Sequence, residues 1–336
     1  MFTRKIAKAT VLCAALLATT SFGYAKTLKL SHNQGPEHPL HISMQHMADK
    51  VSMQHMADKV AEATDGSLKI RIYGNGALGT QRESMELVQE GTLAMAKTNA
   101  SELEAFEESY SALNLPYIFV DENHYFDVLS GPIGDDILAA SADKGFIGLT
   151  FYVEGARSFY ANKEIHSPAD LKGMKIRVQP SPSAIRMVEL LGGSPTPISW
   201  GELYSALQQG VVDGAENNPL ALTTARHGEV SKVYSDDGHT MIPSIVVIST
   251  TVWNSLNSDE QTAIRAAAKS SMHFHRAQWN EMTKEHIEQA KSELNVKFIE
   301  VDKAPFIEAV LPMHAEAAEK SERVGSLITR IKALTQ

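Results

Sequence analysis

Residues 259–294 read DEQTAIRAAAKSSMHFHRAQWNEMTKEHIEQAKSEL and contain neither glycine nor proline. Such a stretch favours one uninterrupted helix, and Ser258 with Gln261 is expected to form a capping box at its start. At about 1.5 Å per residue this helix is about 50 Å long, which exceeds the breadth of one small domain. Two helices with a hidden break are the alternative. We expect one helix that leans across two domains.

Strands and helices alternate through the rest of the chain. Candidate helices begin at capping pairs, such as Thr80 with Glu83 and Ser199 with Glu202. Alternation of this kind indicates an α/β fold with mainly parallel strands. The expected strands are residues 27–31, 68–73, 93–98, 146–153, 175–178, 211–213 and 242–248.

The N-terminus has the features of a secretory signal peptide. Three basic residues precede the uncharged, largely apolar run 9–23, and Gly23-Tyr24-Ala25 supplies small residues for cleavage after Ala25. A membrane anchor is the alternative, but the run is shorter than the roughly 20 residues that span a bilayer. We therefore expect residues 1–25 to be a cleaved signal peptide that directs the chain through the inner membrane to the periplasm.

Composition narrows the functions that remain. The only cysteine, Cys13, lies inside the predicted signal peptide, so the mature chain has neither disulfides nor cysteine metal sites. The formal net charge is −9, and loss of the basic N-terminus makes it more negative. An acidic chain without a basic block is a poor partner for nucleic acid or anionic lipid. We expect a monomer of two domains without nucleic acid.

Residues 43–51 and 52–60 are identical, each reading SMQHMADKV. Nine residues at about 100° each turn a helix by a net half-turn, so the two copies present opposite faces. Only one copy can hold the normal register against a core. The repeat is either a tandem duplication that lengthens the first helix or an error in the sequence.

Motifs for catalysis and metal binding find little support. Residues 74–79, GNGALG, imitate a dinucleotide-binding turn, but they follow the second strand of an exported chain, and we expect a tight turn capped by Thr80. His273 and His275 would point to different faces of the long helix. The sequence has neither HExxH nor Gly-x-Ser-x-Gly. These patterns predict no enzyme, no metal and no cofactor.

Polar residues recur instead at the ends of predicted strands. Open α/β sheets bind ligands beyond the carboxyl ends of their strands, and a guanidinium matches a carboxylate bidentately. Each residue alone could equally be a surface group, but together they predict a pocket for a hydroxylated acid. The residues are Asn33, Asn99, Glu102, Arg157, Arg177, Glu216, Asn217 and Asn218.

The middle of the chain resembles the receptors of TRAP transporters (tripartite ATP-independent periplasmic transporters). The resemblance covers residues 28 to about 312. It rests on five segments: GARSFYAN at 155–162, SPADLKGMKIRV at 167–178, LGGSPTP at 191–197, GELYSALQQG at 201–210 and VDGAEN at 212–217.

This resemblance implies a two-lobed periplasmic-binding-protein (Venus-flytrap) fold with a long helix spanning both lobes. Lobe I would comprise residues 26–154 and 243–282, and lobe II residues 155–242 and 283–336. The family clamps an organic acid with an arginine, here Arg177, supported by Arg157. Asn217 would be a second-lobe contact and Trp200 the aromatic against the ligand. Further lining positions are Asn33, Asn99, Glu102 and His239.

The segment GARSFY resembles most closely the hexuronate-binding branch. An acid at Glu102 would repel a second ligand carboxylate and accept sugar hydroxyls, so the resemblance implies D-glucuronate or D-galacturonate, delivered to a TRAP membrane permease. One alternative is a receptor for a C4-dicarboxylate, which would need a second cation. Another is a periplasmic sugar-acid lyase or isomerase with His239 or Glu102 as base.

Overall fold

The computed structural model describes residues 25–33 and 44–334, with side chains described for 25–33 and 53–334. The predicted signal peptide, apart from Ala25, lies outside these residues. Within the described part of the chain, no helix is both long and apolar enough to cross a membrane.

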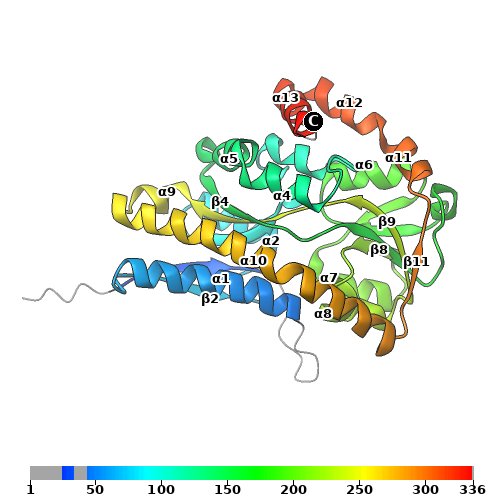
Figure 1. Ribbon diagram of the computed structural model, residues 1–336, viewed down its shortest axis with the longest axis horizontal. Helices are drawn as coiled ribbons and strands as arrows, with labels where there is room; N and C mark the ends of the chain where they lie inside the picture. Colours follow the sequence, from blue (N-terminus) through cyan, green and yellow to red (C-terminus); the bar gives the residue numbers. More distant parts are fainter. Residues whose placement is uncertain (1–24, 34–43, 335–336) are drawn as a thin grey trace, which may run out of the picture.

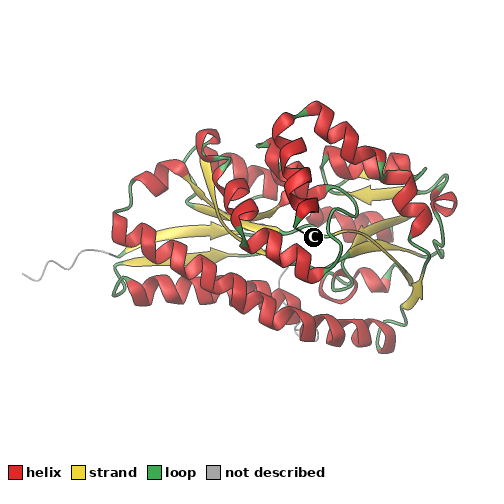
Figure 2. Ribbon diagram, turned by 45° about the horizontal axis from the view of Figure 1, so that its top comes forward, coloured by secondary structure: helices red, strands yellow, loops and turns green. Residues whose placement is uncertain are grey.

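The strands form two separate sheets, one at each end of the elongated molecule (Figures 1 and 2). The first sheet has the order β2-β1-β3-β10-β4, with bounds Leu68–Tyr73, Lys26–Ser31, Met95–Asn99, Ser244–Ser249 and Phe146–Tyr152. The second has the order β11-β9-β5-β8-β6-β7, with bounds Lys297–Glu300, Val233–Thr240, Arg157–Ala161, Gly214–Asn217, Lys175–Val178 and Ser194–Pro197. Two sheets of mixed strands and helices confirm the two-lobed α/β fold.

Both sheets are mixed: five strand pairings are parallel and four are antiparallel, so parallel pairing predominates only narrowly. β10 is antiparallel to β3 and β4, and β5 is antiparallel to β8 and β9. These are the strands through which the chain enters the other sheet: residues 153–156 lead from β4 to β5, and residues 241–243 lead from β9 to β10. Parallel neighbours need a long crossover connection, usually a helix, that returns the chain to the end of the sheet where the previous strand began. The two direct crossings contain no helix, and the strands that they enter run antiparallel to their neighbours.

Helices cover both faces of each sheet. Their bounds are α1 Met44–Ala63, α2 Gln81–Gln89, α3 Ala100–Leu103, α4 Glu122–Ser130, α5 Pro132–Ala139, α6 Pro182–Leu190, α7 Trp200–Gln208, α8 Ala221–Thr224, α9 Thr250–Asn254, α10 Ser258–Ser292, α11 Ala304–Val310, α12 Pro312–Lys320 and α13 Glu322–Ala333. Short 3₁₀ helices are η1 Glu108–Asn114, η2 Ala142–Lys144, η3 Pro168–Leu171 and η4 His227–Glu229.

The predicted long helix is confirmed as α10, 35 residues without a break. It packs against β4 and α1 in the first lobe and reaches α8 in the second (Figure 1). Its capping box is formed by Asn257 and Glu260, one residue before the predicted pair. Asn257 is the cap residue because its side chain accepts hydrogen bonds from the backbone nitrogens of both Asp259 and Glu260.

The packing of the last helix, α13, indicates where the second lobe ends in the sequence. α11 packs on α6, β9 and η3 of the second lobe, but α13 packs on η1 and α5, which lie between β3 and β4 of the first. The predicted division assigned all of residues 283–336 to lobe II. Because of this packing on η1 and α5, we propose the same boundaries with α13 moved to lobe I.

The repeated segment lies in α1. Met53, Met56, Ala57 and Val60 of the second copy are buried in the first-lobe core beside β1 and α10. The second copy therefore holds the register against the core, as a single copy was expected to do. Side chains of the first copy lie outside those described.

Of the local structures predicted from short sequence motifs, some are confirmed and others are wrong. The turn at residues 74–79 ends in the capping box of Thr80 and Glu83, as predicted. Ser199 instead donates to the Glu202 carboxylate and makes no cap to the backbone, so that predicted box is wrong. The expected strand 211–213 is a turn, and β8 begins at Gly214, which places Glu216 and Asn217 inside the strand.

Candidate functional site

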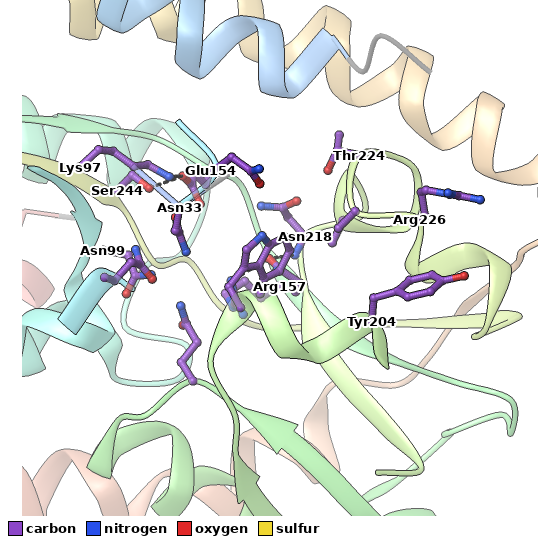
Figure 3. A pocket seen from close by; sticks show the side chains of 18 residues that line it. Asn33, Lys97, Asn99, Glu154, Arg157, Tyr204, Asn218, Thr224, Arg226 and Ser244 are labelled. Carbon is purple, nitrogen blue, oxygen red and sulfur yellow. Dashed lines mark hydrogen bonds and ion pairs between the residues drawn. The ribbon is translucent and has the colours of Figure 1, made fainter. Parts of the chain in front are cut away.

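A polar cleft of about 300 Å³ lies between the two lobes (Figure 3). The first lobe lines it with Asn33, Asn75, Gln81, Lys97, Asn99, Glu154 and Ser244. The second lobe contributes Arg157, Gln179, Trp200, Gly201, Tyr204, Asn217, Asn218, Ala221, Thr224, Ala225 and Arg226. Five of the eight predicted site residues are thus in the lining. The other three, Arg177, Glu102 and His239, are buried outside it.

Arg157 is held by four hydrogen bonds. The antiparallel pairing of β5 and β8 sets Arg157 beside the end of β8. Its Nε and Nη2 donate to the Glu216 carboxylate at 2.7 and 2.9 Å, Nη2 also donates to the Glu216 carbonyl, and Nη1 donates to Asn217 Oδ1 at 2.7 Å. Burial disfavours the charged carboxylate, but Arg157 and His239 outweigh it and lower the pKa of Glu216 to about 2. The arginine is therefore committed to its own lobe.

His239 extends this network away from the cleft. It lies where the register of β9 against β5 shifts, and its side chain is fully buried. Nδ1 bonds Asp237 at 2.8 Å and Nε2 bonds Glu216 at 3.4 Å. Burial opposes protonation, yet the two carboxylates prevail and raise the pKa of His239 to about 9. A protonated histidine with both nitrogens donating is unsuited to act as a base.

Arg177 has a different environment on β6. Its side chain is 2% exposed, and Nε donates to the Ile198 carbonyl at 2.8 Å. Nη1 has no hydrogen-bonding partner among the residues that the structure describes. Burial lowers the pKa of Arg177, partly offset by Glu216. His227, whose pKa falls to about 3 through burial and the nearby Arg177 charge, bonds the Tyr160 hydroxyl at 2.8 Å.

Glu102 is a weaker anion than the sequence suggested. It lies in α3, is 8% exposed, and its backbone nitrogen donates to Asn99 Oδ1. Burial raises its pKa to about 7, against the lowering effect of Arg177. The carboxyl is thus partly protonated near neutral pH and lies behind the lining. These features remove most of its expected repulsion towards a second ligand carboxylate.

The sequence-based site missed a buried ion pair in the first-lobe wall. Lys97 Nζ lies 3.3 Å from Glu154 Oε1, and Ser244 Oγ donates to the same oxygen (Figure 3). Lys97 is only 4% exposed. Nothing in the strand MAKTN (residues 95–99) indicates burial of the lysine, because Glu154 comes from the crossing residues 153–156 and Ser244, which bonds Glu154, begins β10.

The amides of the second lobe present donors and acceptors to the cleft. Asn217 Oδ1 accepts from both Arg157 and the Asn218 backbone nitrogen, which directs its Nδ2 hydrogens elsewhere. Gln179 Oε1 and Asn218 Oδ1 are buried and lack partners in the described part of the chain. Trp200 begins α7, with its ring 5.1 Å from that of His227.

The charges behind the cleft favour an anion. Two arginines and the protonated His239 provide three positive charges. Glu216 and Asp237 provide two negative ones, and Glu102 is only partly ionised. The excess positive charge is concentrated in the second lobe, where Arg177 Nη1 has no described hydrogen-bonding partner. The arrangement suits binding of a small anion whose remaining groups are polar.

Two lobes around a polar cleft define a solute-binding protein. The chain matches the model of the bacterial extracellular solute-binding protein family 7, DctP, over residues 30–321 and belongs to that family. It is a TRAP-type solute-binding protein, and members of this class are binding components of transporters, not enzymes.

Three similar proteins illustrate the family. A TRAP periplasmic solute-binding protein from Anaerococcus prevotii, solved with bound α/β D-glucuronate, is 34% identical, with a TM-score of 0.86 over 92% of this chain and 98% of that one. Another from Xanthobacter autotrophicus Py2, with bound β-D-galacturonate, is 36% identical, with a TM-score of 0.85 over 91% and 99%. The uncharacterized protein YiiZ of Salmonella typhimurium is 38% identical over 95% of each chain.

Proposed function

We propose that this protein is the periplasmic receptor of a TRAP transporter for a hexuronate such as D-glucuronate or D-galacturonate. It would be exported by its signal peptide, capture the sugar acid between its lobes and deliver it to the membrane permease. The two hexuronate-bound relatives support the substrate class, since their structures match 92% and 91% of this chain.

Arg177 Nη1 is the observation that carries the proposal. An unpartnered donor on a buried guanidinium is costly, because the desolvated group gains no hydrogen bond in return. Glu216 cannot serve, since Arg157 and His239 already occupy its carboxylate. Arg177 lies behind the present lining, so the lobes would rearrange around the ligand to bring its carboxylate to the guanidinium. The carboxylate would then give Nη1 a charge-assisted hydrogen bond, which is strong in a desolvated site. The Nδ2 hydrogens of Asn217 would add a second donor.

Hydroxyl groups of the ligand suit the opposite wall. Lys97 can donate to a hydroxyl oxygen while Glu154 accepts from a hydroxyl hydrogen, and the amides of Asn33 and Asn99 can do either. Figure 3 shows these four side chains together on one side of the cleft, facing the second-lobe residues. A sugar acid therefore contacts both lobes, and such contacts favour the closed arrangement over the open one.

A thermal-shift screen of the mature protein tests the substrate class. D-glucuronate and D-galacturonate should raise the melting temperature, because a ligand that binds only the folded state stabilises it, by an amount that grows with the logarithm of its affinity when the ligand is in excess. Succinate and malate should have little effect. Stabilisation by succinate without a response to any uronate would contradict the hexuronate assignment and leave the receptor assignment intact.

The dicarboxylate alternative has one observation in its favour. It required a second cation in the pocket, and Lys97 is such a cation. Glu154 neutralises Lys97, however, so a second ligand carboxylate would have to displace a buried partner. The lyase or isomerase alternative requires turnover of a uronate by the pure protein, and the protonated state of His239 disfavours it as the base.

A further inference from the structure

Glu104 joins the first lobe to a helix of the second. It follows α3, and its Oε1 accepts from Ser181 Oγ at 2.5 Å and from the Ser183 backbone nitrogen at 2.9 Å. Its Oε2 accepts from Ser183 Oγ at 2.7 Å and, within its own lobe, from Asn114 Nδ2 at 2.8 Å. Three of these four hydrogen bonds therefore cross between lobes.

The acceptor is placed where α6 requires a negative charge. The first backbone N–H groups of a helix have no partner within the helix, and the helix dipole favours an anion there. α6 has no acidic residue in its own first turn. Glu104 supplies that charge from the other lobe, so the stability of this helix start depends on how the lobes are placed.

The α6 side of the contact lies away from the crossing residues 153–156, whereas on the first-lobe side α3 begins beside the other crossing segment, where the Ala100 backbone nitrogen donates to the Pro243 carbonyl. In the second sheet β6, which leads into α6, is two strands from β5, the strand entered by the crossing residues 153–156. At about 4.8 Å per strand this gives a lever arm of about 10 Å. A lobe rotation of about 15° would move the contact by roughly 2.5 Å. Hydrogen bonds of normal length do not survive such a displacement.

We infer that Glu104 is a positioning residue that latches the lobes in the closed arrangement and is released when they separate. Each side of the latch is close in sequence to the binding cleft. Ser181 lies two residues after Gln179, and Glu104 lies five residues after Asn99. Both Gln179 and Asn99 line the cleft. The latch should slow ligand dissociation without touching the ligand. Its effect on ligand exchange rests on the proposed function, whereas the lobe contact itself does not.

Distances between spin labels test the latch directly. Because Cys13 is outside the mature chain, cysteines introduced at the exposed Glu90 and Lys172 would be the sole labelling sites, one on each lobe. In the ligand-free protein Glu104→Ala should shift the distance distribution towards longer values. Uronate dissociation measured by stopped flow should accelerate by about tenfold, the equivalent of one charge-assisted hydrogen bond.

Two further variants separate the effect of the contact between the lobes from other effects of replacing a glutamate. Ser183→Ala removes only the other side of the latch and should reproduce the change in smaller measure. Glu107→Gln is the matched control, since Glu107 accepts from Ser109 within its own lobe. If Glu104→Ala does not fold, Glu104→Gln and Ser183→Ala decide the question.

Unchanged label distances and dissociation rates in the Glu104 and Ser183 variants would overturn the latch. The same shifts in Glu107→Gln would do so too, because the effect would then not be specific to the contact between the lobes. If the unmodified protein binds no uronate, the proposed substrate fails, while the ligand-free distances still test the latch.

Discussion

Arg157 and Arg177 are two buried arginines in the same sheet, on β5 and β6, with β8 between them. Arg157 donates four hydrogen bonds to Glu216 and Asn217, whereas Arg177 donates one, to a backbone carbonyl, and keeps Nη1 without a described partner. Burial and neighbouring charge also act differently on them: the pKa of Arg157 is raised and that of Arg177 is lowered. From this comparison we predict a structural role for Arg157, whose partners come from the chain, and a binding role for Arg177, which lacks a described partner at Nη1.

The largest expected effect concerns the satisfied arginine. Arg157→Met leaves the Glu216 carboxylate buried with only His239 beside it, and removing one partner of a buried ion pair typically costs about 3–5 kcal/mol. Chemical denaturation should show a loss of this size. The double variant Arg157→Met/Glu216→Leu should recover much of it, since both charges are gone. Equal losses in the two variants would mean that the pair itself is not the source of the stability.

The unsatisfied arginine should give the opposite pattern. Arg177→Met should weaken uronate binding by about 2–5 kcal/mol in titration calorimetry, the usual cost of truncating one side of a desolvated charge pair. Stability without ligand should be unchanged or higher, because a buried cation with a missing partner is removed. Near-native affinity in this variant would transfer the clamp to another residue.

A smaller effect is expected at Glu102. Its pKa of about 7 in the folded chain exceeds the ordinary value of 4.5, so the folded protein binds this proton more tightly than the unfolded chain. The contribution of Glu102 to stability therefore decreases as the pH rises from about 4.5 to 7. Glu102→Gln should match the unmodified protein at pH 4.5 and exceed it above pH 7 in urea unfolding. A constant difference across this range would exclude the titration of Glu102 as its cause.

The smallest effect is expected from the repeated segment. Deleting residues 43–51 and deleting residues 52–60 give the same sequence, which retains the buried positions of Met53, Met56, Ala57 and Val60. Neither the melting temperature nor uronate affinity should fall. A marked loss of stability would show that both copies contribute to the core.

Predictability differed between long and short patterns. Thirty-six residues without glycine or proline were enough to predict α10. A strand-to-helix turn with Thr80 and Glu83 was enough to predict the cap of α2. Strands β5, β7, β8, β9 and β11 were not expected from periodicity. Polar residues or glycine interrupt these strands, which become regular only when neighbouring strands pair with them.

The type of site could be predicted from the sequence, but the hydrogen bonding of its residues could not. Strand-end positions and the family resemblance identified both arginines, but which guanidinium had a free nitrogen depended on Glu216, which is 59 residues from Arg157 and 39 from Arg177. Lys97 was missed because its burial depends on Glu154 and Ser244, which are distant in sequence. Long-range pairing of this kind leaves no local pattern in a single sequence.

A crystal structure of the protein with D-glucuronate tests the central claim most directly. The account predicts the ligand carboxylate within about 3.2 Å of Arg177 Nη1, with Arg157 still bonded to Glu216 and the sugar hydroxyls facing Lys97 and Glu154. A carboxylate bound at Lys97 or at the rim residue Arg226, with Arg177 Nη1 still without a partner, would contradict it.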